Sequence, residues 1–225
     1  TTLAAYQDRM PEDQPYYYYA CGESVDKIAK LPQVERIMDK GYEILYCTED
    51  VDDFVMKALG EVNGKQFKSV SDEDALPQTE EEKKAAEEKA EAGKDVLEAV
   101  KEALGDQVKN VRVSSILKSG ACCLSADGPV SLEMEKYMSK LEGSDHPPGA
   151  PKRRELGSDH PKADRVLELN PDAAPFAAIK KAVDAGDKDT VAKYAKLLYG
   201  QSLLMAGLPL EDPAEYAQMV CSLMV

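Results

Sequence analysis

Residues 16–21, Tyr-Tyr-Tyr-Tyr-Ala-Cys, open the stretch that decides the fold of the first part of this 225-residue chain. Strand-like segments follow at 42–47 and 66–70, and they alternate with helical patterns at 24–40 and 51–59. The second helix is well marked, because Asp50 can cap it and five apolar residues recur at helical spacing after it. The order βαβαβ favours right-handed crossovers. It predicts a small parallel-sheet domain at residues 1–75.

The composition changes after this unit, where residues 71–93 consist largely of Asp, Glu, Lys and Ala. Pairs such as Lys83 and Glu87 have the i,i+4 spacing that supports an exposed helix. The far end of the same pattern, from Val96 to Leu104, gains an apolar face and stops at Gly105. We therefore predict a charged connector helix over 76–104 that docks on a second core.

Residues 105–225 are predicted to form a second, α+β domain, so the fold class is α+β / α/β. Strand patterns at 108–117 and 121–126 are separated by Lys118-Ser119-Gly120, which is typical of a hairpin. A short helix at 131–141 comes next, and then a mobile loop at 142–165 and a strand at 166–169. Helical patterns at 174–185, 190–206 and 212–224 complete the chain.

The composition limits the partners of the chain. A net charge of −14 repels phosphate backbones, so nucleic acid is not expected as a partner. We expect no membrane partner either, because no apolar run approaches the roughly 20 residues that span a bilayer. Five cysteines without a C-x-x-C spacing predict reduced thiols rather than disulfides or a zinc site. These features indicate a cytoplasmic protein.

The motifs that suggest catalysis are weak. Gly-Ser-Asp-His-Pro occurs at 143–147 and again at 157–161, but neighbouring residues of a loop cannot hold a catalytic triad. The two histidines and two aspartates of these repeats lack a third strong metal ligand. The sequence has no G-x-x-x-x-G-K-[ST] motif for phosphate, and the acidic run 80–91 lacks the glycine turn of a calcium loop. We predict no catalytic residue and no metal site.

Two apolar stripes remain as candidate interaction surfaces. The first is on the short helix, where four apolar residues have the spacing i, i+3, i+4, i+7: Met134, Tyr137, Met138 and Leu141. Spacing alone favours core packing, yet thioethers adapt to irregular partners, so an exposed binding stripe remains an alternative.

The second stripe is at the end of the chain. It consists of Val191, Tyr194, Leu197, Leu198, Leu204, Met205, Tyr216, Met219, Val220, Leu223 and Met224. A helical hairpin with such a face can pair with a second copy as a four-helix bundle. Burial inside one subunit is the alternative.

Several segments, in this order, resemble the ninety-kilodalton heat-shock chaperone family of the bacterial HtpG type. The resemblance lies in five segments: 16–18 (Tyr-Tyr-Tyr), 41–54 (Gly-Tyr-Glu-Ile-Leu to Val-Asp-Asp-Phe), 64–70 (Gly-Lys-Gln-Phe-Lys-Ser-Val), 108–112 (Val-Lys-Asn-Val-Arg) and 167–171 (Leu-Glu-Leu-Asn-Pro). Residues 208–213, Leu-Pro-Leu-Glu-Asp-Pro, fit the turn before a last dimer helix.

The resemblance implies that this chain is the C-terminal half of an ATP-dependent chaperone, with 1–75 ending the middle domain and 105–225 forming the dimerisation domain. On that view the segment is not an enzyme, and ATP and Mg bind upstream, so the segment holds no cofactor. The expected partners are a second copy, partly folded client proteins and a bacterial co-chaperone. The resemblance places clients on Asp53, Phe54 and Lys57 and on the stripe at 134–141, and the dimer contact on the stripe at 191–224.

Two other functions stay open from the residues. One is a stand-alone homodimeric adaptor that recognises a folded partner. The other is a small-molecule enzyme built on the βαβ unit, since such units bind ligands beyond the carboxyl ends of their strands. The loops that would serve this purpose, at 22–23 and 48–50, are generic in composition.

Overall fold

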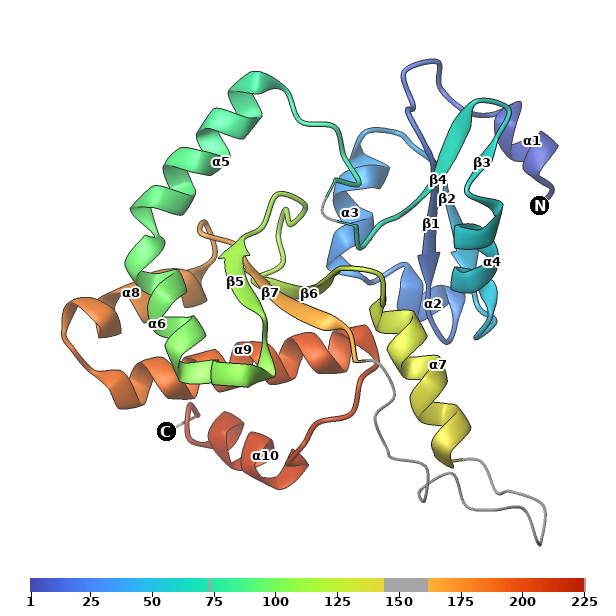
Figure 1. Cartoon of the computed structure of the whole chain (residues 1–225). Helices are drawn as coiled ribbons and strands as arrows, with labels where there is room; N and C mark the ends of the chain where they lie inside the picture. Colours follow the sequence, from blue (N-terminus) through green and yellow to red (C-terminus); the bar gives the residue numbers. More distant parts are fainter. Residues whose placement is uncertain (73, 144–161, 225) are drawn as a thin grey trace, which may run out of the picture.

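The structure, a computed structural model, describes residues 1–72, 74–143 and 162–224, except the side chains at 141–143. Two mixed α/β units lie side by side, each built on one small sheet (Figure 1). The predicted loop at 142–165 and both Gly-Ser-Asp-His-Pro repeats fall almost entirely outside the described residues.

The first unit holds a four-stranded sheet of order β2-β1-β4-β3. Its elements are α1 (Leu3–Gln7), β1 (Tyr17–Cys21), α2 (Val25–Ile28), α3 (Pro32–Asp39), β2 (Ile44–Cys47), α4 (Asp52–Leu59), β3 (Glu61–Val62) and β4 (Lys65–Ser69). β1 runs parallel to both β2 and β4, whereas β3 is antiparallel to β4. The three predicted strands therefore pair in parallel, and β3 adds an antiparallel edge strand that the sequence analysis did not predict.

The added strand follows from a tight turn. Asn63 and Gly64 both have positive φ, at 51° and 78°. This is the geometry of the two-residue turn that matches the twist of a hairpin, and Asn-Gly is its preferred sequence. The chain therefore folds back at once, and β3 pairs with β4.

The predicted single helix at 24–40 is two helices. Pro32 is the cause, because a proline disfavours helical geometry at the preceding residue. Leu31 is accordingly extended, with φ −65° and ψ 131°, and α3 begins with Pro32 at its first turn. Both helices cover one face of the sheet, where Ile28, Val34 and Ile37 pack against Tyr18. α4 covers the opposite face (Figure 1).

The second unit holds a three-stranded sheet of order β5-β7-β6. Its strands are β5 (Asn110–Val113), β6 (Cys122–Asp127) and β7 (Asp164–Leu169). β7 lies between the other two, parallel to β5 and antiparallel to β6. The predicted hairpin of 108–117 with 121–126 is therefore wrong. The chain leaves β5 because the Ser114 hydroxyl accepts hydrogen bonds from the amides of Ile116 and Leu117, at 3.2 Å each, which turns the backbone away.

Helices enclose the second sheet. They are α5 (Glu80–Ala92), α6 (Lys94–Leu104), α7 (Leu132–Gly143), α8 (Ala174–Asp184), α9 (Lys188–Ala206) and α10 (Pro213–Cys221), with a short 3-10 turn at Gly105–Gln107. α5 has no buried residue and leads along the outer edge of the molecule into α6 (Figure 1). Val96, Val100 and Leu104 of α6 are buried in the main core with Ala195 and Leu198 of α9.

Candidate polypeptide-contact surface

α4 has its acidic side buried and its apolar side exposed. The Asp53 side chain, 3% exposed, accepts hydrogen bonds from the Tyr19 hydroxyl at 3.0 Å and the Ser131 hydroxyl at 2.7 Å. Lys57 Nζ lies 3.2 Å from the same carboxylate. Burial, and then the Asp53 charge, raise the pKa of Tyr19 well above its ordinary value, so the phenol stays protonated and donates. These contacts fix the rotation of the helix.

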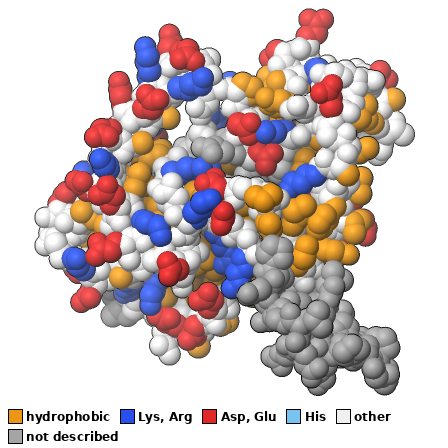
Figure 2. Space-filling model, in the orientation of Figure 1, with side chains coloured by type: hydrophobic (Ala, Val, Ile, Leu, Met, Phe, Trp, Pro, Cys, Tyr) orange, Lys and Arg blue, Asp and Glu red, His pale blue; other side chains and the backbone are white. Residues whose placement is uncertain are grey.

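The opposite side of α4 faces solvent. Val51, Val55 and Leu59 are 47%, 46% and 49% exposed, and an apolar patch covers this part of the surface (Figure 2). Apolar positions at helical spacing ordinarily face a core. Here the buried Asp53 prevents that arrangement, and the apolar residues are left open.

α7 lies directly against α4. The Phe54 and Tyr137 rings meet edge to face with centroids 5.3 Å apart, and Lys57 Nζ lies 4.0 Å from the Met134 sulfur. Met134, Tyr137 and Met138 are half-buried, while Leu132 and Glu135 occupy the buried side of α7. Phe54 and Lys57 thus lie on one surface with Met134, Tyr137 and Met138, although Leu141 lies outside the described side chains.

One member of the predicted client set is misplaced. Asp53 is not available to a partner, because the sheet and α7 enclose it. Its role is to hold α4 against β1 and α7. Phe54 and Lys57 remain accessible in part.

The predicted dimer stripe divides in two. Val191, Leu197 and Leu198 are buried in the core of their own chain, so the prediction that they face a second copy is corrected. α9 lies against β6, α6 and α8, which takes up this side of the helix. The members left largely exposed are Leu204, Leu223 and Met224, while Tyr194, Met205, Tyr216, Met219 and Val220 are half-buried.

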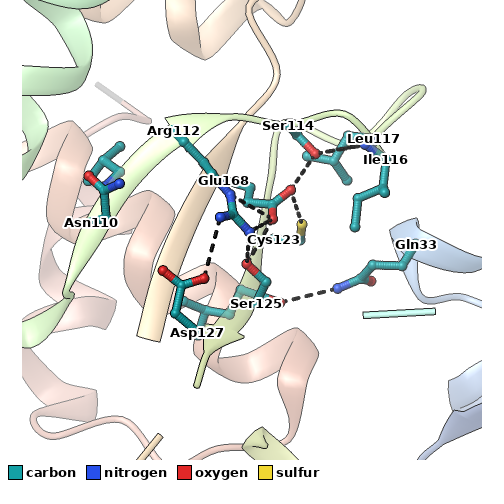
Figure 3. Close-up of polar contacts among 12 residues, drawn as sticks. Gln33, Asn110, Arg112, Ser114, Ile116, Leu117, Cys123, Ser125, Asp127 and Glu168 are labelled. Carbon is teal, nitrogen blue, oxygen red and sulfur yellow. Dashed lines mark hydrogen bonds and ion pairs between the residues drawn. The ribbon is translucent and has the colours of Figure 1, made fainter. Parts of the chain in front are cut away.

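A buried polar network, not foreseen from the sequence, organises the second sheet (Figure 3). Glu168, 1% exposed, accepts hydrogen bonds from Arg112 Nη2 at 2.9 Å, Ser125 at 2.7 Å and Ser114 at 2.8 Å. Burial, and then the Glu168 charge, raise the pKa of the adjacent Cys123 thiol. A carboxylate satisfied in this way is structural, because no position is left for a reacting group.

The described residues contain neither a metal-binding cluster of three or more side chains nor a membrane-spanning helix. Among residues 1–72, 74–143 and 162–224, no group of three His, Cys, Asp or Glu side chains could hold a metal ion. Within these ranges, no helix is both long and apolar enough to cross a bilayer.

The similarity to known proteins extends over the whole chain. A family model described as "Hsp90 protein" matches residues 1–225. The chain belongs to the Hsp90 family. It is 44% identical to the chaperone protein HtpG of Bacillus subtilis (strain 168), 46% to that of Clostridium acetobutylicum and 45% to that of Clostridium perfringens (strain ATCC 13124). These matches cover 99–100% of the chain and 33% of each relative, so the chain spans a third of their length.

The comparison corrects three predictions. The chain was assigned to the C-terminal half of the chaperone as its client-binding and dimer-forming region, but the match amounts to a third of the relatives' length and does not support that assignment. The statements that the segment lacks the nucleotide site and carries no ATP or Mg do not stand either, because they rested on the same assignment.

Proposed function

We propose that the chain is part of a molecular chaperone and that the surface made by α4 and α7 contacts partly folded polypeptides. The family supports the chaperone function, and the relatives named above are chaperones. One observation supports the location. Val51, which precedes α4, and Val55 and Leu59 of α4 are exposed, whereas Asp53 of the same helix is buried.

The chemistry of this surface suits unfolded segments. Exposed aliphatic side chains beside half-exposed methionines can accept many apolar sequences, because thioethers and flexible chains adapt to irregular partners. Each such contact contributes only modestly, about 25 cal/mol per Å² of apolar surface removed from water. Binding would therefore be broad in specificity and reversible.

Substitution of Val55→Ser with Leu59→Ser tests the proposal. The two side chains make no contribution to a core, so the chain should unfold at the same urea concentration as wild type. Its affinity for a permanently unfolded test protein, such as reduced and carboxymethylated lactalbumin, should fall several-fold. Fluorescence anisotropy of the labelled test protein measures the affinity.

The matched control lies on the other side of the same unit. Val25 and Met38 are each 54% exposed and belong to α2 and α3. Val25→Ser with Met38→Ser removes comparable apolar surface and should leave binding unchanged. Equal losses in the two variants would refute this location. A loss of binding to one folded protein, with no effect on the unfolded protein, would favour the adaptor function instead.

We also propose that the parent protein acts in the cytoplasm as a homodimer. The family supports the dimeric state in general, and the exposed side chains of Leu204, Leu223 and Met224 offer an apolar contact for a second copy. Sedimentation of a Leu204→Ser and Leu223→Ser variant tests the contact. An unchanged oligomeric state would refute it.

A further inference from the structure

Two cysteine side chains lie next to each other at the carboxyl ends of β1 and β2. Cys21 and Cys47 are partners in the parallel register of these strands, and both are free thiols. A hydrogen bond of 3.1 Å from the Gly22 amide to the Cys47 carbonyl holds the register at the strand ends. Neighbouring strands lie about 4.8 Å apart, and residues paired in this way point to the same face of the sheet. The two sulfur atoms are therefore neighbours.

One thiol of the pair can be reached from outside. Cys21 is half-buried and lines a cleft of about 460 Å³ between the two units, whereas Cys47 is 5% exposed. Tyr19 lies two residues before Cys21 and donates to Asp53 of α4, so both thiols lie on the α4 face of the sheet. A small ion that enters the cleft can thus contact Cys21, with Cys47 beside it and largely shielded from water.

The two thiols also interact with each other. The hydrogen bond with Cys47, and then burial, raise the pKa of the Cys21 thiol well above its ordinary value. Two thiolates side by side would repel each other. Metal binding displaces thiol protons, and a cation shared by both sulfur atoms would remove that repulsion. The register thus places two ligands where one cation can bridge them.

The number of ligands indicates which ion the pair suits. Across residues 1–72, 74–143 and 162–224, no third His, Cys, Asp or Glu side chain joins the two thiols to form a metal-binding group. Zinc takes at least three protein ligands, and magnesium and calcium prefer oxygen. Thiolates select soft ions, and Cu(I) is a soft ion that is stable with two sulfur ligands.

We propose that Cys21 and Cys47 form a binding site for Cu(I), with the two sulfur atoms as its ligands. On binding, two S–H bonds break, two Cu–S bonds form and two protons pass to the solvent, so no electron is transferred. The ion would link the ends of β1 and β2, just before the chain enters α2 and α4. Because it binds the folded arrangement of the two strands, it should also stabilise the chain against unfolding.

Anaerobic titration of the reduced chain with Cu(I) tests the site, with bicinchoninate as a coloured competitor for the ion. The wild-type chain should withdraw one equivalent of Cu(I) from bicinchoninate, and its X-ray absorption spectrum should show two sulfur ligands. Cys21→Ser and Cys47→Ser should each weaken binding about 100-fold or more, since loss of even an outer-shell partner costs about 10–100-fold. Cu(I) should raise the urea midpoint of the wild-type chain but of neither variant.

Cys221→Ser is the matched control, because it removes an exposed thiol from α10 and leaves the pair intact. It should bind Cu(I) as tightly as the wild-type chain. Amide shifts of the ¹⁵N-labelled wild-type chain on addition of Cu(I) should centre on Gly22 and Thr48, which locates the ion even if a variant folds poorly. No transfer of Cu(I) from bicinchoninate, shifts centred elsewhere, or equal affinity in all three variants would overturn the proposal.

Discussion

Replacing Asp53 by Ala should destabilise the chain strongly, because this buried side chain holds α4 in place while its neighbours Val55 and Leu59 face solvent. The side chain accepts hydrogen bonds from Tyr19 and Ser131 and pairs with Lys57. Hydrogen bonds to a charged group are each worth about 1.5–3 kcal/mol. The variant also leaves the Tyr19 hydroxyl buried without its acceptor, and Tyr19 is 2% exposed. Lys57 is partly exposed and can be solvated once Asp53 is removed, so the loss comes mainly from the two hydrogen bonds, and we expect about 3 kcal/mol or more.

Urea unfolding followed by circular dichroism measures this loss, since the chain has no tryptophan to report by fluorescence. Asp26→Ala is the control, because Asp26 also lies in the first turn of a helix but is exposed, and it should change stability by about 0.5 kcal/mol or less. Tyr19→Phe should cost about 1–3 kcal/mol alone and close to nothing in the Asp53→Ala background. If Asp53→Ala costs under about 1 kcal/mol, or if the two losses add, the carboxylate is not the anchor of α4.

Three further outcomes are expected. Phe54→Ala and Tyr137→Ala should show a coupling of about 0.5–1.5 kcal/mol in a double-mutant cycle of urea unfolding, because their rings meet edge to face, and strict additivity would contradict this contact. The hydrogen bond from Arg9 lowers the pKa of Glu43 in the folded chain. This ion pair therefore stabilises the folded chain above the unfolded pKa of about 4.3, and the stabilisation is lost as the pH falls through the lowered pKa. Glu43→Gln should therefore lower the unfolding midpoint at neutral pH but not in strong acid, and the same shift at both pH values would refute the pairing. Gly200→Ala should displace α10, because an added Cβ would lie 2.6 Å from a ring carbon of that helix, and unchanged amide exchange in α10 would argue against this packing.

Local signals predicted the elements of the first unit better than their arrangement. β1, β2 and β4 lie where strand patterns occur, and α4 covers the predicted helical stretch. Two differences between the predicted and the observed elements have causes that are visible in the sequence. Pro32 marks the break between α2 and α3, and Asn63-Gly64 marks the turn that adds β3.

The second sheet could not be derived from local patterns. Lys118-Ser119-Gly120 is a sound turn sequence, but β5 and β6 pair with β7 instead of with each other. Pairing across many residues depends on packing and leaves little trace in a local pattern. The Glu168 network shows the same limit, because Arg112, Ser125 and Glu168 meet only after the register of three strands is set.

The candidate surface was predicted by residue type more than by geometry. The apolar spacing of α4 is typical of a face that packs on a core. The apolar residues face solvent instead because Asp53 bonds Tyr19 and Ser131, which are distant in the sequence. Gln33 carries no motif either, and its contact with the Leu124 carbonyl arises only because α3 packs against the edge of the second sheet.

The place of β7 also sets the order of events when the chain is made. β5 and β6 have no partner in the sheet until residues 164–169 have left the ribosome, because β7 is the strand that joins them. Contacts between residues so distant in sequence form slowly, and unpaired strands are prone to aggregation in the interval. The first unit, whose strands all lie within residues 17–69, has no such delay. A growing chain would therefore hold a finished first sheet beside an unprotected half of the second, so the chain passes through a state that needs protection during synthesis.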